Sequence, residues 1–541
     1  MALLEMAAFM LLLLPRHSEN ASPGLLPAVL VLIALGLLQR LRPIPIDAPA
    51  SLLPFTASAY ATTQALLLWS AYAVVLWRLP KVMDGPETVR LFAWAIFLMG
   101  FAIAIAGLIQ TAQGNQSYLG LRAVRAELNP FGPLVNRDHA ASLMALSAFM
   151  GLGIFMSLLP SLRGDGAPGK TADTVAQQAL VLFLTAVIVA GIAATRCRGI
   201  MHAAALGVFV FGMAASSTLG SSRRIWSART LLLMGAAGFA ISLWYHPSWL
   251  GWKNGALDGS TTIRLSLYRS GSQMLRDFPL FGVGLGAIQN ALPSYQAASV
   301  HGVVEHLHND WLELAVQAGI AGSCAVLFGS MIFARRVWSG WRTAASPEMR
   351  GLAAGGITGA LCFLFHGLVD FSFQTPGIAM VFVILLAWLG SDALLRGEAR
   401  RPAVPAPPAS WLPRLALGLA GLMLLLLSSR PAVASWYAHR ADSAPMSSKA
   451  NFLERASRWD PRPEYSARAA RIQLELAEAY PAAKILLLRE ALRDAEAALQ
   501  ADPVNPAFRT LHTQILAGLG RPDELPVQSK QVVFNYRHAD R

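Results

Sequence analysis

The chain has 541 residues with a mean hydropathy of +0.46, and only 14% of its residues are charged. Soluble domains carry roughly 25% charged residues, so this composition excludes an ordinary water-soluble protein and is typical of a polytopic membrane protein. The net charge is +13, but most basic residues are scattered as short pairs between apolar runs. That scatter argues against the clustered basic face of a nucleic-acid-binding protein.

Apolar runs that are long enough to cross a hydrocarbon core of about 30 Å recur along the chain. They lie at residues 24–39, 57–78, 88–110, 138–159, 177–195, 199–218, 229–246, 309–334, 351–369, 376–395 and 412–429. A further run at 3–15 is short, and we expect no cleavable signal peptide there because a positive leader and a small-residue cleavage site are missing. The sequence therefore predicts an all-α fold, namely a polytopic helical membrane protein with about 11 or 12 transmembrane helices.

Basic loops set the expected orientation, since positive loops favour the cytoplasm. The loop 247–308, the turn at Asp370 and the tail after residue 430 then lie on the outer, periplasmic face of the bacterial inner membrane. Two arginine groups also fall outside, against the rule, and indicate an anionic ligand there: Arg196 with Arg198, and Arg122 with Arg125 and Arg137. The clusters expected inside are Arg223, Arg224 and Arg229; Arg335, Arg336, Arg342 and Arg350; and Arg396, Arg400 and Arg401.

The first polar motif, Thr-Arg-Cys-Arg-Gly at residues 195–199, joins two spans with almost no loop. Its arginines are therefore expected at the membrane boundary, where Arg198 either binds an anion or only extends its charge to the interface. The three cysteines, Cys197, Cys324 and Cys362, lack the spacing of a disulfide framework or a zinc site, and we expect them to be small packing residues.

A second motif lies in the large outer loop, where Arg264 and Tyr268 are one helical turn apart. A run of alternating glycines follows at residues 282–286, directly after Phe278-Pro279-Leu280-Phe281. The proline excludes the strand that a dinucleotide-binding glycine loop requires. We expect instead a tight turn whose backbone approaches a ligand closely.

The third motif is His308-Asn309, followed after nine residues by Gly319-x-x-Gly322. Charged and amide side chains at the mouth of a membrane helix are costly, which favours a functional site. Helical spacing would place His308 and Leu312 on one face and Asn309, Glu313 and Gln317 on another. The glycines would let a neighbouring helix approach. A metal cluster of His301, His306 and His308 is the alternative, but no carboxylate pair or cysteine accompanies them at ligand spacing.

A fourth, weaker motif is Asn136-Arg137-Asp138-His139-Ala140. With the other three it resembles the bacterial O-antigen ligase and polymerase superfamily of integral-membrane glycosyltransferases, over roughly residues 90–395. The spacing from His308 to Gly322 is similar to the family signature, and Arg198 is similar to the arginine of its Ser-Arg-Gly motif, with Cys197 in place of serine. The fourth motif is similar to an Asn-Arg-Asn-His-Phe-Ala segment of some members, from which Asp138 and Ala140 depart.

The resemblance implies a GT-C-like fold and transfer of glycan from a polyprenyl-pyrophosphate carrier to an acceptor hydroxyl on the periplasmic face, with no cofactor and no required metal. Arg198 and Arg264 would bind the departing pyrophosphate through bidentate guanidinium groups, and His308 would act as the general base. The residues that we expect to contact substrate are Arg122, Arg125, Asn136, Arg137, His139, Tyr268, His306 and Asn309.

The acceptor stays open, because ligases and polymerases of this family share these motifs. A ligase uses lipid A-core, a polymerase uses a second lipid-linked glycan, and a third kind of member transfers to protein. A transporter or flippase of lipid-linked oligosaccharide is the alternative from another class. Its expected internal repeat is not visible, and the cations gather at one face and not midway through the membrane.

The sequence divides into N-terminal spans at 1–80, a ligase-like membrane domain at 81–430 and a tail at 431–541. In the tail, Ala-Ser-Arg-Trp-Asp-Pro at 456–461 is echoed by Ala-Ala-Leu-Gln-Ala-Asp-Pro at 497–503. This resembles tetratricopeptide repeats, although the interval of about 42 residues exceeds the usual 34 or so. Such a tail would dock a periplasmic protein, whereas a plain helical hairpin would only cap the membrane domain.

Overall fold

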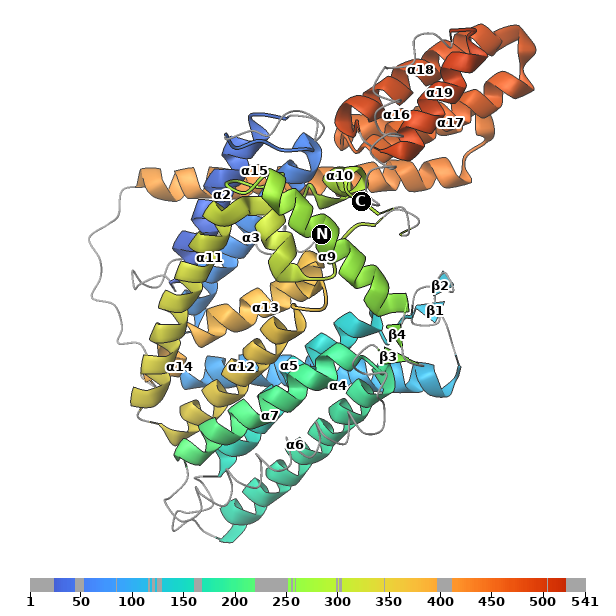
Figure 1. The fold of residues 1–541 in the computed structure, drawn as a ribbon. Coiled ribbons are helices and arrows are strands. Elements are labelled where there is room, and N and C mark those ends of the chain that lie inside the picture. Colours follow the sequence, from blue (N-terminus) through green and yellow to red (C-terminus); the bar gives the residue numbers. More distant parts are fainter. Residues whose placement is uncertain are drawn as a thin grey trace.

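A computed structural model describes residues 24–43, 53–83, 85–114, 117–118, 122–123, 129–159, 168–218, 252–253, 256–257, 259–297, 300, 304–344, 346–396, 411–503 and 505–521. The fold is an all-α bundle, as predicted, and a smaller helical tail stands at one end of it (Figure 1). The bundle helices are α2 (Leu25–Arg40), α3 (Ala59–Val82), α4 (Pro86–Ala112), α5 (Arg137–Leu158), α6 (Pro168–Thr195), α7 (Arg198–Thr218), α11 (Asp310–Thr343), α12 (Pro347–His366), α13 (Pro376–Leu389), α14 (Asp392–Arg396) and α15 (Trp411–Ser443).

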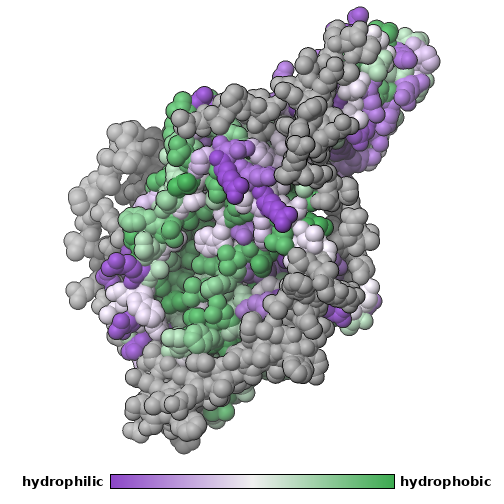
Figure 2. All heavy atoms as spheres, in the orientation of Figure 1, coloured by the Kyte–Doolittle hydropathy of each residue, from purple (hydrophilic) through white to green (hydrophobic). Residues whose placement is uncertain are grey.

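These helices confirm a polytopic membrane protein. Within the described part of the chain, six of them, α3 to α7 and α11, are long and apolar enough to cross a membrane, and α2 and α13 are shorter apolar helices. Hydrophobic residues cover much of the visible face of the bundle, whereas hydrophilic residues dominate the tail (Figure 2). The predicted runs at 3–15 and 229–246 lie outside the described residues, and the run at 376–395 is divided into α13 and α14 at Gly390.

The centre of the bundle is α5, which packs closely against α12 through small residues. A Cβ atom added to Gly153 would lie 2.9 Å from the Cα atom of Gly355, and one added to Gly351 would lie 2.8 Å from the backbone nitrogen of Ser157. Small residues allow this approach between membrane helices, where apolar burial gives no strong driving force. The close α5–α12 contact fixes the ends of both helices, and polar side chains gather at those ends.

The short elements between α4 and α5 and between α7 and α11 lie at one end of the bundle, opposite α14 (Figure 1). They include α9 (Gly259–Asp277), α10 (Ile288–Ala291), the 3-10 turn η4 (Leu292–Ser294) and two small antiparallel ribbons: β1 (Ser117–Tyr118) with β2 (Arg122–Ala123), and β3 (Trp252–Lys253) with β4 (Ala256–Leu257). The short η5 (Ser372–Gln374) connects α12 to α13.

A kink in α11 explains the glycine run at residues 282–286. Gly319 has φ +64° and ψ −168° inside α11, so the helical hydrogen bonds are broken there. The 278–286 turn replaces them, because the nitrogens of Val283 and Gly284 donate to the oxygens of Val316 and Gln317 at 2.9 and 3.2 Å. The glycines have positive φ and approach the protein's own backbone. The expectation that they also approach a ligand stays a prediction.

The tail consists of α16 (Met446–Trp459), α17 (Pro463–Ala479), the 3-10 turn η6 (Pro481–Ala483), α18 (Lys484–Ala501) and α19 (Pro506–Gly518). Asp460 and Asp502 lie at the C-terminal caps of α16 and α18, each followed by proline, which cannot continue a helix. The tail contacts the bundle at Tyr60 of α3. The Tyr60 hydroxyl donates to Asp460 at 2.9 Å and accepts from Nε of Arg462 at 3.2 Å.

Candidate active site

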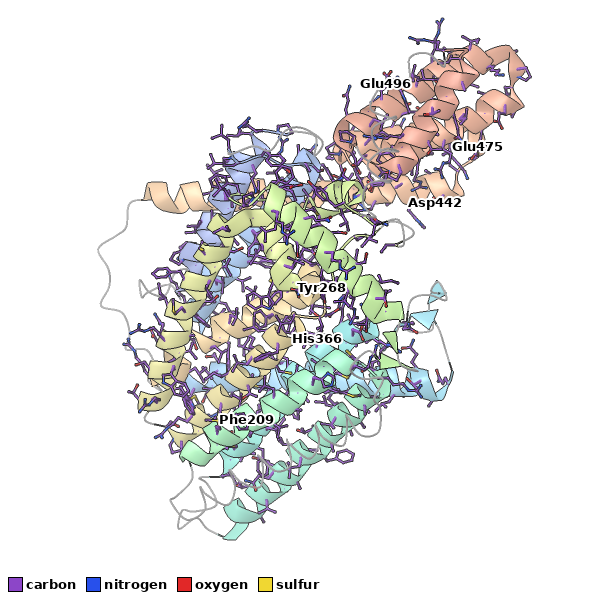
Figure 3. All side chains as sticks on the ribbon, in the orientation of Figure 1. Phe209, Tyr268, His366, Asp442, Glu475 and Glu496 are labelled. Atoms are coloured by element: carbon purple, nitrogen blue, oxygen red, sulfur yellow. The ribbon has the colours of Figure 1, made fainter. Side chains whose placement is uncertain are left out.

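Polar side chains from α5, α9, α11 and the α12–α13 connection meet at the end of the bundle that carries α9 and α10. Tyr268 on α9 and His366 at the end of α12 mark the place in Figure 3. The Tyr268 hydroxyl donates to the backbone oxygen of His308 at 3.0 Å and lies 3.4 Å from that of Leu368. Tyr268 thereby joins α9, the start of α11 and the α12–α13 connection.

His308 lies just before α11 and not on it. Its φ of +54° is a left-handed conformation that non-glycine residues adopt rarely, and such strain is often retained at functional sites. The expected alignment of His308 with Leu312 on one helix face is therefore wrong. Asn309 caps the helix instead, since its side-chain oxygen accepts from the nitrogen of Leu312 at 2.9 Å.

The imidazole of His308 is half-buried and uncharged at neutral pH. Burial and the nearby positive charge of Arg264 lower its pKa to about 4. Its Nδ1 atom is buried and has no hydrogen-bond partner among the described residues. A neutral imidazole with an unused ring nitrogen can accept a proton from a ligand hydroxyl.

Arg264 is held near this histidine by α5. A guanidinium nitrogen of Arg264 lies 3.9 Å from the carboxylate of Asp138, and Nε of Arg137 lies 4.0 Å from the same carboxylate. Asn136 caps α5 by accepting from the nitrogen of Asp138 at 2.9 Å. Asn136 and Asn309 thus both serve as helix caps, a local role that their predicted substrate contact did not include.

The phenyl ring of Phe371 lies at the centre of the site, in contact with three histidines. His306 stacks on it with a centroid distance of 4.6 Å, and His139 and His308 meet it edge-on at 4.7 Å each. Phe371 therefore fixes the positions of imidazoles from α5 and from the segment before α11. A large apolar ring also excludes water from between them.

Asp370, the neighbour of Phe371, holds a buried polar network. Its carboxylate lies 3.5 Å from Nδ1 of His366 and 3.7 Å from Nε2 of His139, and it accepts from the Ser372 hydroxyl at 2.7 Å. The side chain of Asp370 is 2% exposed. Burial alone raises the pKa of this carboxyl, but the charges of His366 and His139, with the Ser372 hydrogen bond, hold it below its usual value. Asp370 is therefore a carboxylate at neutral pH.

The Thr-Arg-Cys-Arg-Gly motif joins this network through Cys197 and Gly199. Sγ of Cys197 lies 3.5 Å from Nε2 of His366, so the expectation of a simple packing residue is too limited for this cysteine. A Cβ atom on Gly199 would lie 2.9 Å from the His366 ring, which explains the need for glycine. Arg198 is the first residue of α7 and is half-buried, beside Cys197 in sequence.

His306 is paired with a carboxylate from within α11. Its Nδ1 lies 2.9 Å from Glu313, whose other oxygen accepts from the nitrogen of Leu307 at 2.8 Å. Burial lowers the pKa of His306, but the hydrogen bond and charge of Glu313, together with Glu305 and Asp370, outweigh burial and raise it overall. His306 and His308 therefore have opposite pKa shifts two residues apart.

The structure thus brings Arg264, Tyr268, His306, His308 and His139 into one region, with Arg198 at its edge beside Cys197. The side chains of Arg122 and Arg125 lie outside the described residues. In the described part of the chain, no three His, Cys, Asp or Glu side chains form a group that could hold a metal ion.

Residues absent from the predicted set include the Asp370 carboxylate, the Phe371 ring and His366. Their signal in the sequence was weak. Histidine and aspartate stand four residues apart at the end of one apolar run, where an isolated polar pair favours function.

A comparison with protein families agrees with the resemblance seen in the motifs. Residues 181–327 match the family model described as O-antigen ligase. The matched segment contains Arg198, Arg264, Tyr268, His308 and both glycines of the α11 signature, whereas α5 and the α12–α13 connection lie outside it. No curated protein matches the chain.

Proposed function

We propose that this chain, whose residues 181–327 match the O-antigen ligase family model, transfers glycan from a polyprenyl-pyrophosphate carrier to an acceptor hydroxyl at the periplasmic face. The observation that carries this proposal is that Tyr268, one helical turn after Arg264 on α9, donates to the backbone oxygen of His308 at 3.0 Å. This contact brings Arg264 close enough for its charge to help lower the pKa of His308. A departing pyrophosphate needs cations, and an acceptor hydroxyl needs a neutral base.

Donor binding would activate the base. The Asp138 carboxylate lies 3.9 Å from a guanidinium nitrogen of Arg264. A pyrophosphate that binds Arg264 and Arg198 with bidentate geometry competes with this weak pair. Its negative charge would offset the positive charge that lowers the pKa of His308, and the imidazole would become a stronger base only in the complex.

The reaction then follows from these residues. His308 accepts the proton of the acceptor hydroxyl through an imidazole nitrogen, and the acceptor oxygen forms the new glycosidic bond as the bond to the pyrophosphate breaks. Arg264 and Arg198 stabilise the charge on the leaving group. Tyr268 holds the His308 backbone, while Phe371 and Asp370 position the surrounding rings.

The test is transfer by the purified, reconstituted protein from a defined polyprenyl-pyrophosphate glycan to separate acceptors: lipid A-core, a second lipid-linked glycan and a peptide. Formation of a new glycosidic product with one of them supports the proposal and names the acceptor. Movement of intact donor between leaflets without any product would instead favour a flippase.

Metal chelation should leave this activity unchanged, because two arginines supply the positive charge that a divalent cation gives other glycosyltransferases. Initial transfer rates with and without a strong chelator, measured on protein purified in chelator, provide the check. A loss that Mg²⁺ or Mn²⁺ restores would contradict the assigned role of the arginines.

The orientation predicts which sites are accessible from outside the cell. Cysteines introduced at Ser260 and Ser447 should react with a membrane-impermeant maleimide in intact cells, and one at Ser346 should react only after lysis, because basic loops stay inside. A Cys324→Ser background removes the native exposed cysteine. If Ser346→Cys is labelled in intact cells and Ser260→Cys is protected, the orientation is the reverse of the one predicted, and the active-site proposal fails.

The tail is proposed to be a tetratricopeptide-like docking module and not part of the catalytic centre. Truncation after Arg440 should preserve transfer with purified substrates while impairing function in cells, because the Tyr60 contact joins the tail to α3 and not to His308. Transfer assays and complementation with the same variant give the two readouts. Complete loss of transfer from a normally folded truncation would contradict this separation.

A further inference from the structure

A large cavity runs between α2, α3, α11, α12 and α13. Its volume is about 1480 Å³, which exceeds the roughly 300–1,000 Å³ of sites for drug-sized molecules. His306 and Glu313 line one end, whereas Arg198, Arg264, Tyr268 and His308 do not line it. The cavity therefore adjoins the candidate active site at His306 but does not include the two arginines proposed to bind pyrophosphate.

The walls of the cavity are mostly hydrocarbon. Leu68 of α3, Ile357 and Leu361 of α12 and Leu386 of α13 contribute to them. Figure 2 shows a hollowed hydrophobic area on the visible face of the bundle, between the segments that Figure 1 labels α11 and α12. Walls of this kind suit a flexible apolar chain and offer few partners to a soluble polar metabolite.

The other end of the cavity is basic. Arg335 and Arg342 on α11 and Arg350 on α12 all line it. Among the described residues, none of these three forms an ion pair with a carboxylate, and Nε of Arg350 is buried without a hydrogen-bond partner. The nearby carboxylates are engaged elsewhere: Glu348 pairs with Arg90, and Asp392 pairs with Arg336 and Arg396. Three guanidinium groups therefore face one cavity with unused hydrogen-bonding capacity.

Tryptophans mark the same end as a membrane boundary. Trp338 and Trp341 line the cavity, with ring centroids 5.1 Å apart, and Nε1 of Trp341 donates to the Arg350 oxygen at 3.1 Å. Tryptophan is enriched where headgroups meet hydrocarbon. Along α11, Arg335 lies 18 positions after Gln317, a rise of about 27 Å, close to the hydrocarbon thickness of about 30 Å. The arginines thus lie one hydrocarbon thickness away from the His306 end.

We propose that the basic end of this cavity binds an anionic phospholipid, with its phosphate at Arg335, Arg342 and Arg350 and its acyl chains along the apolar walls. A soluble phosphate would satisfy the arginines but leave the walls uncovered. A neutral lipid would cover the walls but leave the cations without partners. Basic pockets between membrane helices bind anionic headgroups for the same reason.

The experiment is native mass spectrometry of the full-length protein after incubation with phosphatidylglycerol or phosphatidylcholine in equal amounts. The wild-type protein should retain phosphatidylglycerol in preference to phosphatidylcholine. Arg335→Gln with Arg342→Gln should weaken that retention by about fivefold for each arginine, or about 25-fold together. Both side chains are exposed, so this variant should fold normally, and Arg350→Gln is tested separately.

Arg336→Gln is the matched control. It removes the same charge from the same helix, but Arg336 pairs with Asp392 and does not line the cavity. Its lipid retention should equal that of the wild type. Leu361→Trp places a larger side chain in the apolar part of the cavity and should lower retention without changing the charge.

Three outcomes would overturn the proposal. They are equal retention of phosphatidylcholine, a loss in Arg336→Gln as large as in the double variant, and displacement of phosphatidylglycerol by soluble glycerol phosphate. The last result would mean that only the phosphate is recognised. Each variant is compared at matched size-exclusion profiles, so a folding defect is recognised before lipid retention is measured.

Discussion

Replacing His308 by alanine should reduce the rate of glycan transfer by roughly 10²–10⁴-fold, the usual contribution of a general base. Donor binding should change little, because the arginines and not the imidazole hold the pyrophosphate. Single-turnover rates and separate measurement of donor affinity distinguish the two effects. The exposed His439 of α15 supplies a matched control, and His439→Ala should keep wild-type activity. Full activity of His308→Ala would remove this histidine from the mechanism.

The pH dependence of kcat/KM is an independent test of the role of His308. A base with a pKa of about 4 is deprotonated above that pH, so kcat/KM should stay level from pH 7 down to about 5 and fall as the pH passes through 4. An ordinary histidine would already lose activity near pH 6.5. A fall of kcat/KM near pH 6.5 in the wild-type protein would contradict the claim that burial and Arg264 lower the pKa of His308.

Replacing Arg264 by alanine should weaken donor binding and reduce turnover by roughly 10²–10³-fold, as for loss of one group that stabilises transition-state charge. Arg264→Lys should recover little, because lysine lacks the planar guanidinium that binds two phosphate oxygens at once. Arg264→Gln should also move the acid limb of kcat/KM upward, since the positive charge that lowers the pKa of His308 is gone. A merely structural arginine would not shift this limb.

Arg269 on the same helix is the control for Arg264. It is exposed on α9, and Arg269→Ala should keep both the rate and the pH profile of the wild type. Equal losses for Arg264→Ala and Arg269→Ala would show that α9 only needs positive charge, and the assignment of a specific pyrophosphate contact would fail.

Much of the bundle could be predicted because apolar length is a local property of the sequence. Runs such as 138–159 and 199–218 became α5 and α7 within a few residues. The division at Gly390 and the kink at Gly319 were harder to see, since each depends on what packs beside it. At Gly319, the 278–286 turn supplies the hydrogen bonds that the helix loses, and that partner is distant in sequence.

The candidate site was predictable only in part, for a related physical reason. Arg264, Tyr268 and His308 stand in motifs whose residue types point to phosphate and hydroxyl chemistry. No sequence pattern predicts the left-handed backbone of His308, because histidine tolerates several conformations. Asp370 and Phe371 reach the site through long-range packing, about sixty residues after His308, so no local pattern connects them.

The most direct measurement is a structure of the protein with a lipid-linked pyrophosphate bound. Phosphate oxygens are expected within about 3 Å of the guanidinium groups of Arg264 and Arg198. The Asp138 carboxylate should be displaced from Arg264, and His308 should lie within hydrogen-bond reach of the acceptor position. A pyrophosphate bound away from both arginines, or His308 more than about 15 Å from it with no closing loop, would contradict the proposed mechanism.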